Sequence, residues 1–296
     1  MGNPDDATHD VVLAYLQSQR DALEAAFTSA YDGDEGGVHD MRVASRRLRS
    51  CLRTFRGLWD RSAVDAARAE LKWLADRLGP VRDAQVMSAR LDAAVRDEPP
   101  ELVVGPIGDH LPRHFARDEA EAQGELRRSL ASARYRSLLS MIAQLAVSPT
   151  RKRGPAWVAK RVRRDVHRAE AKLDEALAVD NDGRDSGDRD EHLHDARKAY
   201  KRGRYAVEVL RPAGGKPARR LVKRLKAAQD VLGAYQDSII TREVLYHVAE
   251  QEFREGGNTF TYGLLHARQA SRGERSLSGV ARASRRARRR KVRRWL

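Results

Sequence analysis

A row of regularly spaced basic side chains in residues 38–59 is the part of the sequence best suited to chemistry. On an α-helix, which turns by about 100° per residue, these side chains form one narrow stripe. The stripe consists of His39, Arg42, Arg46, Arg49, Arg53 and Arg56. Apolar residues, among them Met41, Leu48 and Phe55, form a second stripe nearly opposite. Such a helix can bury one edge in a bundle and present cations that bind an anion on the other.

The stripe occurs twice, which indicates two homologous halves. The repeated residues are His39, Asp40, Arg42, Ala44, Arg47 and Arg49, matched at an offset of 155 (194 − 39) by His194, Asp195, Arg197, Ala199, Arg202 and Arg204. Arg46 returns as Lys201, so its charge is kept. Further along, LKWLADRLGPVRD (71–83) matches LKAAQDVLGAYQD (225–237) at an offset of 154 (225 − 71). This period is far too long for a solenoid repeat.

The like charges of each stripe need an explanation, because cations three or four residues apart repel by about 0.2–0.5 kcal/mol per pair. Carboxylates on neighbouring helices, such as Glu70 or Asp76, could neutralise the row. That explanation is weaker for a stripe that both halves keep without acids at the usual i+4 positions inside it. We therefore expect the paired stripes to bind an anion. Arg47 and Arg202 lie off the stripes and are expected to form structural ion pairs.

His39 and His194 are expected in the first turns of their helices, where exposed amide groups and the helix dipole favour anions. A neutral imidazole can donate one hydrogen bond to a phosphate oxygen, and a protonated one adds charge. A pair of metal ligands is the rival interpretation, but no HxxxH or HxxE pattern around either residue completes a metal site. Asp40 and Asp195 are instead expected to cap or pack the helices. Neither a metal nor a cofactor is predicted.

Further basic residues are candidates for binding the same anion, with an ion pair or surface solubility as the alternative role. They are Lys72, Arg82, Arg136, Arg164 and Lys226. Lys72 and Lys226 are repeat equivalents, whereas the counterpart of Arg82 is Gln236.

The overall charge points to a polyanionic partner. The chain has 296 residues, with 57 Lys and Arg against 42 Asp and Glu, which gives a formal charge of +15. Such a surface attracts nucleic acid, acidic membrane surfaces or inorganic phosphate chains. Residues 282–294 alone, with nine basic side chains in thirteen positions, would indicate a nucleic-acid-binding arm or else an extension of the same positive surface.

The remaining composition favours a cytoplasmic protein. No apolar run of about 18 residues occurs, and the acidic, polar first ten residues do not resemble a signal peptide. Cys51 is the only cysteine, so no internal disulfide is possible, in agreement with a reducing compartment.

Helical periodicity and the scarcity of aromatic residues, 6%, predict an all-α fold. In the first half, helices are expected over 12–27, 38–59, 61–96 with an interruption at Gly79 and Pro80, 107–131 and 134–147. A second set begins at a linker in 148–155, followed by a polar loop over 180–191. The later helices are expected over 192–211, 217–232, 234–255, 259–270 and 277–295. Glycine-rich breaks are expected at 31–37, 214–216 and 256–258.

Together the motifs resemble the CHAD family, the conserved histidine α-helical domain. The resemblance rests on VHDMRVASRRLRSCLRTF with LKWLADRLGPVRD and on LHDARKAYKRGRYAVEVL with LKAAQDVLGAYQD, and it spans residues 8–296. It implies two four-helix bundles, 8–148 and 155–296, related by a pseudo-twofold axis with a basic channel between them. It also implies inorganic polyphosphate as the ligand and an association with polyphosphate granules. Gly203 departs from the family pattern, which usually has Leu there, so it either thins the core or admits another helix.

The sequence therefore predicts a non-catalytic protein that binds inorganic polyphosphate. The expected ligand-binding residues are His39, Arg42, Arg46, Arg49, Arg53, Lys72, Arg82, Arg136, Arg164, His194, Arg197, Lys201, Arg204 and Lys226. Nucleic-acid binding is the first alternative, although aromatic stacking platforms are scarce near the stripes and no recognition-helix module is apparent. A phosphohydrolase that uses His39 and His194 is the second, but no Gly-rich phosphate loop, acidic metal cluster or activated nucleophile accompanies them. No membrane partner is expected, and the sequence leaves the oligomeric state open.

Overall fold

The computed structural model describes the backbone of residues 6–181 and 186–296 and the side chains of residues 10–178 and 187–296. In this part of the chain all regular structure is helical, as predicted. The first half contains α1 (Asp6–Ala25), α2 (Phe27–Asp32), α3 (Glu35–Thr54), α4 (Arg61–Arg96), α5 (Ile107–Ala131) and α6 (Ala133–Val147), with 3₁₀ turns at Arg56–Leu58 and Pro100–Leu102. The second half contains α7 (Pro155–Asn181), α8 (Ser186–Val209), α9 (Arg211–Arg254), α10 (Phe260–Leu277), α11 (Val280–Arg288) and α12 (Arg290–Arg293).

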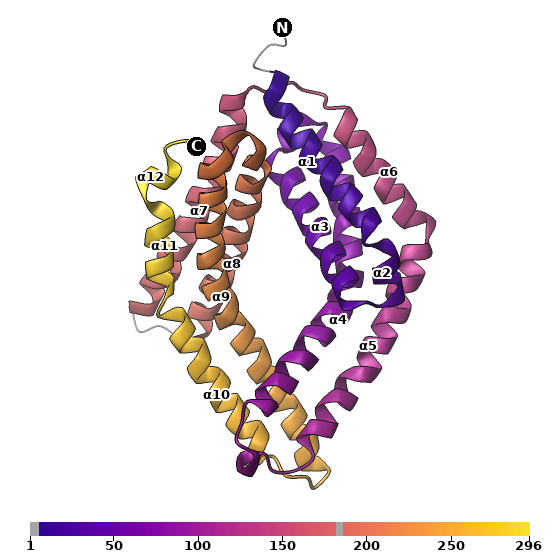
Figure 1. The fold of residues 1–296 in the computed structure, drawn as a ribbon, viewed down its shortest axis with the longest axis vertical. Coiled ribbons are helices and arrows are strands. Elements are labelled where there is room, and N and C mark those ends of the chain that lie inside the picture. Colours follow the sequence, from indigo (N-terminus) through magenta and orange to yellow (C-terminus); the bar gives the residue numbers. More distant parts are fainter. Residues whose placement is uncertain (1–5, 182–185) are drawn as a thin grey trace.

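The two halves form the two sides of an elongated, diamond-shaped molecule (Figure 1). Helices α1–α6 make up one side and α7–α12 the other, and the repeat-equivalent helices α3 and α8 pack against each other where the sides meet. A large apolar core surrounds this contact and includes Leu48 of α3 and Tyr200 of α8. A smaller core joins α4 and α5 to α9 and α10 at the far tip, through residues such as Leu91, Leu111 and Leu245. The halves are thus joined at both ends of the diamond.

Several helix boundaries differ from the sequence prediction. The predicted interruption at Pro80 is absent: α4 runs through it, because the buried Leu78 and Val81 on either side hold the helix in the core at the cost of one backbone hydrogen bond. α9 is continuous where a break near residue 233 was expected, and its kink falls at Gly215, inside the predicted 214–216 break. α10 extends to Leu277, and the last predicted helix is divided into α11 and α12. The linker is confirmed between α6 and α7.

Both stripe-bearing helices begin earlier than predicted. Asp34 caps α3, because its Oδ1 accepts a hydrogen bond from the backbone N–H of Gly37 at 2.9 Å, so the helix starts at Glu35. α8 starts at Ser186, so residues 186–191 of the predicted polar loop are helical, whereas residues 182–185 lie outside the described part of the chain.

The early helix starts overturn the predicted helix-terminus role of the histidines. His39 and His194 stand beyond the first turns, where the influence of the helix dipole has already faded. Asp40 is exposed within α3 and does not cap it, and Asp195 lies inside α8, where its Oδ1 accepts from Lys198 Nζ at 3.1 Å. The predicted capping role of both aspartates is therefore wrong.

Gly37 sets how closely α2 packs on the start of α3. A Cβ at this position would lie 2.4 Å from the backbone nitrogen of Ala30 and 2.5 Å from the backbone carbon of Ser29. We expect Gly37→Ala to lower the free energy of unfolding by about 1–3 kcal/mol, measured by urea denaturation. Gly124→Ala in α5 is the matched control, because the nearest atom to its Cβ is 3.7 Å away. That control should be neutral or stabilising by up to about 1 kcal/mol, and equal losses in both variants would contradict the close packing of α2 on α3.

Candidate functional site

Part of each stripe lines a groove between α3, α7 and α8, to which α4 contributes Arg68. The groove consists of two adjacent hollows, of about 330 and 290 Å³, that share Arg53 and Arg202. Their basic lining residues are Arg46, Arg49, Arg53, Arg56, Arg68, Arg164, Arg168, Lys198, Lys201 and Arg202. Among the described lining residues only Asp165 carries a carboxylate, and its Oδ2 accepts a hydrogen bond from Thr54 Oγ1 at 2.6 Å. We refer to this surface as the basic groove.

Most of the charge in the basic groove has no counter-charge. Within the described residues, no carboxylate lies within 4.0 Å of the charged groups of Arg46, Arg49, Arg53, Lys201 or Arg202. The Nε atom of Arg46 is buried without a hydrogen-bond partner. Burial lowers the pKa of all these cations, and nearby guanidinium groups lower it further. The empty groove therefore disfavours its own cations and would be stabilised by a bound anion.

Lys201 shows this effect most strongly. Burial lowers its pKa to about 7, and Arg197, Arg46 and Arg42 contribute to the shift in the same direction. Because a lysine ammonium ordinarily has a pKa of about 10.4, this group is partly neutral near physiological pH in the empty protein. An anion placed beside it would favour the charged form.

Two repeat-equivalent contacts join α3 and α8, and one is an attractive ion pair whereas the other places two arginines together. Positions 47 and 53 are the repeat equivalents of 202 and 208, at the offset of 155 (202 − 47). Arg47 Nε donates to the buried Glu208 Oε2 at 3.2 Å, which confirms the predicted ion-pair role of Arg47. At the equivalent contact, Arg202 faces Arg53 and, after burial, contributes most to lowering the pKa of that guanidinium. The predicted ion-pair role of Arg202 is wrong, because Arg rather than Glu stands at position 53.

Comparison with known proteins identifies the family. The CHAD domain matches residues 14–246 of the chain. The chain belongs to the CHAD family. The predicted extent of the domain, 8–296, is longer than this match and stays a prediction. In the described residues, no helix is both long enough and apolar enough to cross a membrane.

Two curated relatives and two solved structures are similar to this CHAD domain. "Uncharacterized protein Rv2226" of Mycobacterium tuberculosis strain H37Rv is 32% identical over 281 residues, which cover 92% of this chain and 51% of that protein. "Uncharacterized protein MT2285" of strain CDC 1551 has the same identity and coverage, so the chain spans about half the length of these relatives. PptA from Streptomyces chartreusis superposes with a TM-score of 0.72 at 20% identity, covering 94% of this chain and 99% of that one. The CHAD domain from the plant Ricinus communis gives a TM-score of 0.68 at 24% identity, covering 94% and 92%; both structures show the fold.

Two predicted ligands of the CHAD domain, Arg42 and Arg197, are held by carboxylates of the second repeated motif. Arg42 Nη1 lies 2.7 Å from Asp83 Oδ1, and Arg197 Nη2 lies 3.4 Å from Asp237 Oδ1. Asp83 and Asp237 are repeat equivalents at the offset of 154 (237 − 83), so the duplicated motifs preserve the same pair in each half. Each of these arginines precedes the groove-lining residues of its stripe in the chain, and its charge is already partly neutralised by the paired aspartate. The pseudo-twofold axis between the halves stays a prediction.

Arg204 is turned to the neutralised side of the α3–α8 contact. Its guanidinium pairs with Glu208, its Nε donates to Gln229 Oε1 at 2.9 Å, and it lies 4.4 Å from the ring centroid of Tyr205. Unlike its neighbour Lys201, it does not line the basic groove. Its position indicates a structural role.

Glu208 should be the most important single carboxylate for stability. Glu208→Gln leaves Arg47 and Arg204 without a counter-charge in a buried site, and should lower the free energy of unfolding by about 3–5 kcal/mol in urea denaturation. Asp76→Asn is the control, because Asp76 pairs with Lys72 on the exposed surface of α4 and should cost at most about 1 kcal/mol. A Glu208→Gln variant as stable as this control would contradict the neutralised contact.

The two histidines occupy equivalent positions beside the second repeated motif. His194 Nδ1 lies 3.0 Å from Gln236 Oε1, and the equivalent residue near His39 is Arg82, which pairs with Glu35. Burial lowers the pKa of both histidines; Arg82 lowers that of His39 further, and nearby Lys198 does so for His194. Both are therefore neutral at pH 7 in the empty protein, and neither lines the basic groove.

The two histidines should make the empty protein less stable as the pH falls below about 6.5. Because their folded-state pKa lies below the unfolded value of about 6.5, the unfolded chain binds more protons as the pH falls below that value. The stability that neutral histidine contributes is thus fully present above pH 6.5 and is lost on acidification. His39→Gln/His194→Gln should have an unchanged thermal midpoint at pH 7.5 and a shallower fall between pH 6.5 and 5. Parallel curves for the wild type and the variant would assign the acid instability to other groups.

Three further predicted ligands lie outside the basic groove. Lys72 and Lys226 are exposed and pair along their own helices with Asp76 at 2.7 Å and Asp230 at 2.6 Å. Arg136 is exposed on α6, which lies at the outer edge of the molecule (Figure 1), and its Nη1 donates to the backbone carbonyl oxygen of Ala131, the last residue of α5, at 3.1 Å. The surface-solubility alternative describes these positions better than ligand binding.

The predicted set omits several residues that the structure brings into the basic groove. They are Arg56, Arg68, Arg168, Lys198 and Arg202. The presence of Arg168 could have been inferred from Gly203, which lets α7 approach α8 closely. A Cβ at position 203 would lie 3.3 Å from the carbonyl oxygen of Asp165 in α7. The missing side chain admits α7, and α7 then brings Arg168 and the predicted ligand Arg164 beside Arg202.

Proposed function

We propose that this CHAD domain binds inorganic polyphosphate in the basic groove and does not act on it chemically. One observation carries the proposal: Arg202 faces Arg53 at a contact whose repeat equivalent is the Arg47–Glu208 ion pair. The fold accommodates a carboxylate at one of these contacts, Glu208, but has Arg53 at the other. The second contact therefore stays positively charged and can bind an external anion. The planar fork of each guanidinium suits bidentate contact with phosphate oxygens.

The lining of the groove favours a phosphate chain over a nucleic acid. Single-stranded nucleic acids gain about 1–3 kcal/mol per base from stacking on aromatic side chains. In the described lining, Tyr205 is the only aromatic residue, and the guanidinium of Arg204 already lies 4.4 Å from its ring centroid. The groove thus offers charge along its length without a free stacking platform.

The surroundings of the histidines support binding rather than catalysis. A catalytic imidazole needs a group that orients it and a nucleophile or water within hydrogen-bond reach. His194 Nδ1 contacts the side-chain amide of Gln236, and the charge that lowers the pKa of His39 most is that of Arg82. Neither arrangement activates a nucleophile. As part of the same proposal, the protein acts in the cytoplasm and associates with polyphosphate granules through this binding.

A competition assay tests the proposed function. Labelled long-chain polyphosphate bound to the protein at about 0.15 M salt is challenged with unlabelled polyphosphate, RNA, duplex DNA and tripolyphosphate at equal phosphate concentration. We expect unlabelled long-chain polyphosphate to displace the label at least about tenfold more effectively than RNA or DNA. Equal displacement by RNA would favour the nucleic-acid alternative. Release of inorganic phosphate that disappears in His39→Gln/His194→Gln would favour the hydrolase.

A further inference from the structure

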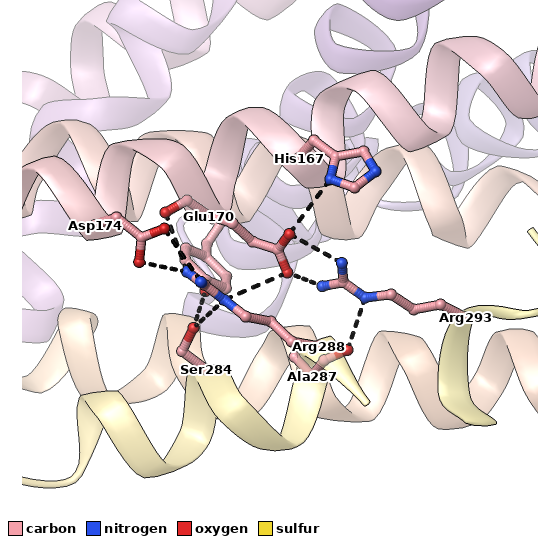
Figure 2. Close-up of polar contacts among 8 residues, drawn as sticks. His167, Glu170, Asp174, Ser284, Ala287, Arg288 and Arg293 are labelled. Carbon is pink, nitrogen blue, oxygen red and sulfur yellow. Dashed lines mark hydrogen bonds and ion pairs between the residues drawn. The ribbon is translucent and has the colours of Figure 1, made fainter. Parts of the chain in front are cut away.

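The structure divides the basic C-terminal segment, residues 282–294, into two arginines that form ion pairs with α7 and seven basic residues that are exposed. Arg288 donates to both carboxylate oxygens of Asp174, at 2.6 and 3.1 Å, and Arg293 donates to both oxygens of Glu170, one contact measuring 2.9 Å (Figure 2). Glu170 is only 8% exposed, and Arg288 also donates to its backbone carbonyl oxygen at 3.2 Å. These two arginines attach α11 and α12 to α7.

Further contacts fix the segment in place. Ser284 Oγ lies 3.0 Å from the hydroxyl of the buried Tyr200, and Ala287 and Val292 are buried in the main core. The ring of Trp295 packs against α9 at Gly214, where a Cβ would lie 2.6 Å from it. The segment is therefore a docked part of the fold rather than a free arm.

The other seven basic side chains all face solvent. They are Arg282, Arg285, Arg286, Arg289, Arg290, Lys291 and Arg294. On α11 the first three of them follow an i, i+3, i+4 spacing, so they share one helix face. The sequence has no Asp or Glu after Glu274, and none of the seven forms an ion pair with a described residue. We refer to this surface as the outer basic face.

The outer basic face is separated from the basic groove by α7. Arg164, Asp165 and Arg168 of α7 line the groove, whereas Glu170 and Asp174 of the same helix hold α11. At about 100° per residue these two sets lie roughly 150° apart around α7, so they are on nearly opposite sides of it. Figure 1 shows α11 and α12 at the outer edge of the second half. An anion confined to the groove does not reach this face across a helix about 10–12 Å wide.

We propose that the outer basic face is a second contact surface for the same phosphate chain, so that long chains bind at the groove and around α7 at once. This inference rests on the proposed function. The exposed side chains of the face are cations without an aromatic among them, since Trp295 is half-buried, which matches a bare phosphate chain better than stacked bases. Because the ion pairs with Glu170 and Asp174 and the burial of Ala287 and Val292 fix the segment, little conformational freedom is lost when the chain binds. A second contact on the same ligand strengthens binding through a high effective concentration.

The test compares long-chain polyphosphate with tripolyphosphate, which is too short to occupy both surfaces. Arg285→Gln/Arg286→Gln/Arg289→Gln removes three exposed cations that make no described contact across the fold. We expect the affinity for long-chain polyphosphate to fall by about tenfold or more and its salt dependence to become shallower. The affinity for tripolyphosphate should stay within about twofold. Arg117→Gln/Arg128→Gln/Arg136→Gln, three exposed arginines of α5 and α6, is the matched control and should leave both affinities within about twofold.

The outcomes distinguish the second surface from the proposed function itself. Loss of long-chain binding in the outer-face variant alone supports the proposal. An equal loss for both ligands, or an equal loss in the control, would reduce the effect to general charge and overturn it, as would unchanged long-chain binding. A loss confined to RNA would make the face a nucleic-acid surface instead. Failure of the wild type to bind any polyphosphate contradicts the proposed function, whatever the variant does.

Discussion

Arg53→Glu is expected to remove most polyphosphate binding while leaving the CHAD domain folded. The substitution places a carboxylate opposite Arg202 and thereby copies the Arg47–Glu208 ion pair found at the repeat-equivalent contact. Loss of one charge-assisted contact costs about 1.5–3 kcal/mol, and the new carboxylate repels phosphate in addition. We expect the affinity for long-chain polyphosphate to fall by about 100-fold or more at physiological salt, measured by fluorescence anisotropy of labelled chains.

The stability of this variant separates function from structure. Replacing a repulsive contact by an attractive one should leave the thermal midpoint of the empty protein unchanged or raised. Arg136→Glu makes the same change of charge on the exposed surface of α6 and should weaken binding by less than about threefold. If Arg53→Glu unfolds the protein, or if Arg136→Glu weakens binding equally, the basic groove does not hold the ligand in the way we propose.

Polyphosphate binding is expected to take up a proton at Lys201. Its pKa of about 7 in the empty protein should rise toward the ordinary lysine value when phosphate lies beside it. Between those two values the affinity then falls by up to tenfold per pH unit, or about 50-fold from pH 7 to pH 9. Titrations at pH 7, 8 and 9, with calorimetry in buffers of different ionisation enthalpy, measure both the affinity and the proton uptake.

Three variants make the assignment to Lys201 specific. Lys201→Arg keeps the charge without titrating in this range, so it should bind nearly independently of pH and more tightly than the wild type at pH 9. Lys201→Gln should bind weakly at every pH, and Lys226→Arg on the exposed surface should behave as the wild type. A wild type whose affinity is constant from pH 7 to 9 would contradict the account of Lys201.

The same group predicts how the stability of the empty protein depends on pH. Because the folded-state pKa of Lys201 lies below its unfolded value, the unfolded chain binds more protons between about pH 7 and 10. The contribution of this residue to the free energy of unfolding therefore rises with pH across that window. Below pH 7, where most of this buried amine is charged, Lys201→Gln should melt at a higher temperature than the wild type. The buried charge that serves anion binding thus lowers the stability of the empty protein.

Residue spacing was sufficient to find the helices and the cationic side of α3. The 3.6-residue period places Arg46, Arg49 and Arg53 on one face regardless of what packs against it, and all three line the basic groove. The start of α3 was also readable, since Asp34 is a favoured N-cap residue followed by an acid in the first turn, but the glycines after it suggested a break. The continuity of α4 through Pro80 was not readable, because tertiary burial on both sides outweighs the local penalty.

What the sequence could not give is the partner of each cation across the fold. Arg47 and Arg202 look alike in the two repeats, yet one meets Glu208 and the other meets Arg53, and this difference depends on how α3 and α8 cross. Likewise Arg42 was selected with Arg46 from one stripe, although Asp83 of α4 neutralises only the former. A stripe predicts which side chains share a face; the facing helix decides which of them are left for a ligand.

A crystal structure of the CHAD domain with bound polyphosphate would show which residues hold the phosphate chain. We expect phosphate density in the basic groove, with phosphate oxygens about 2.7–2.9 Å from the guanidinium groups of Arg53 and Arg202 and from Lys201 Nζ. Density restricted to the neighbourhood of His39 and His194, or found only along α11 and α12 with the groove empty, would contradict this expectation.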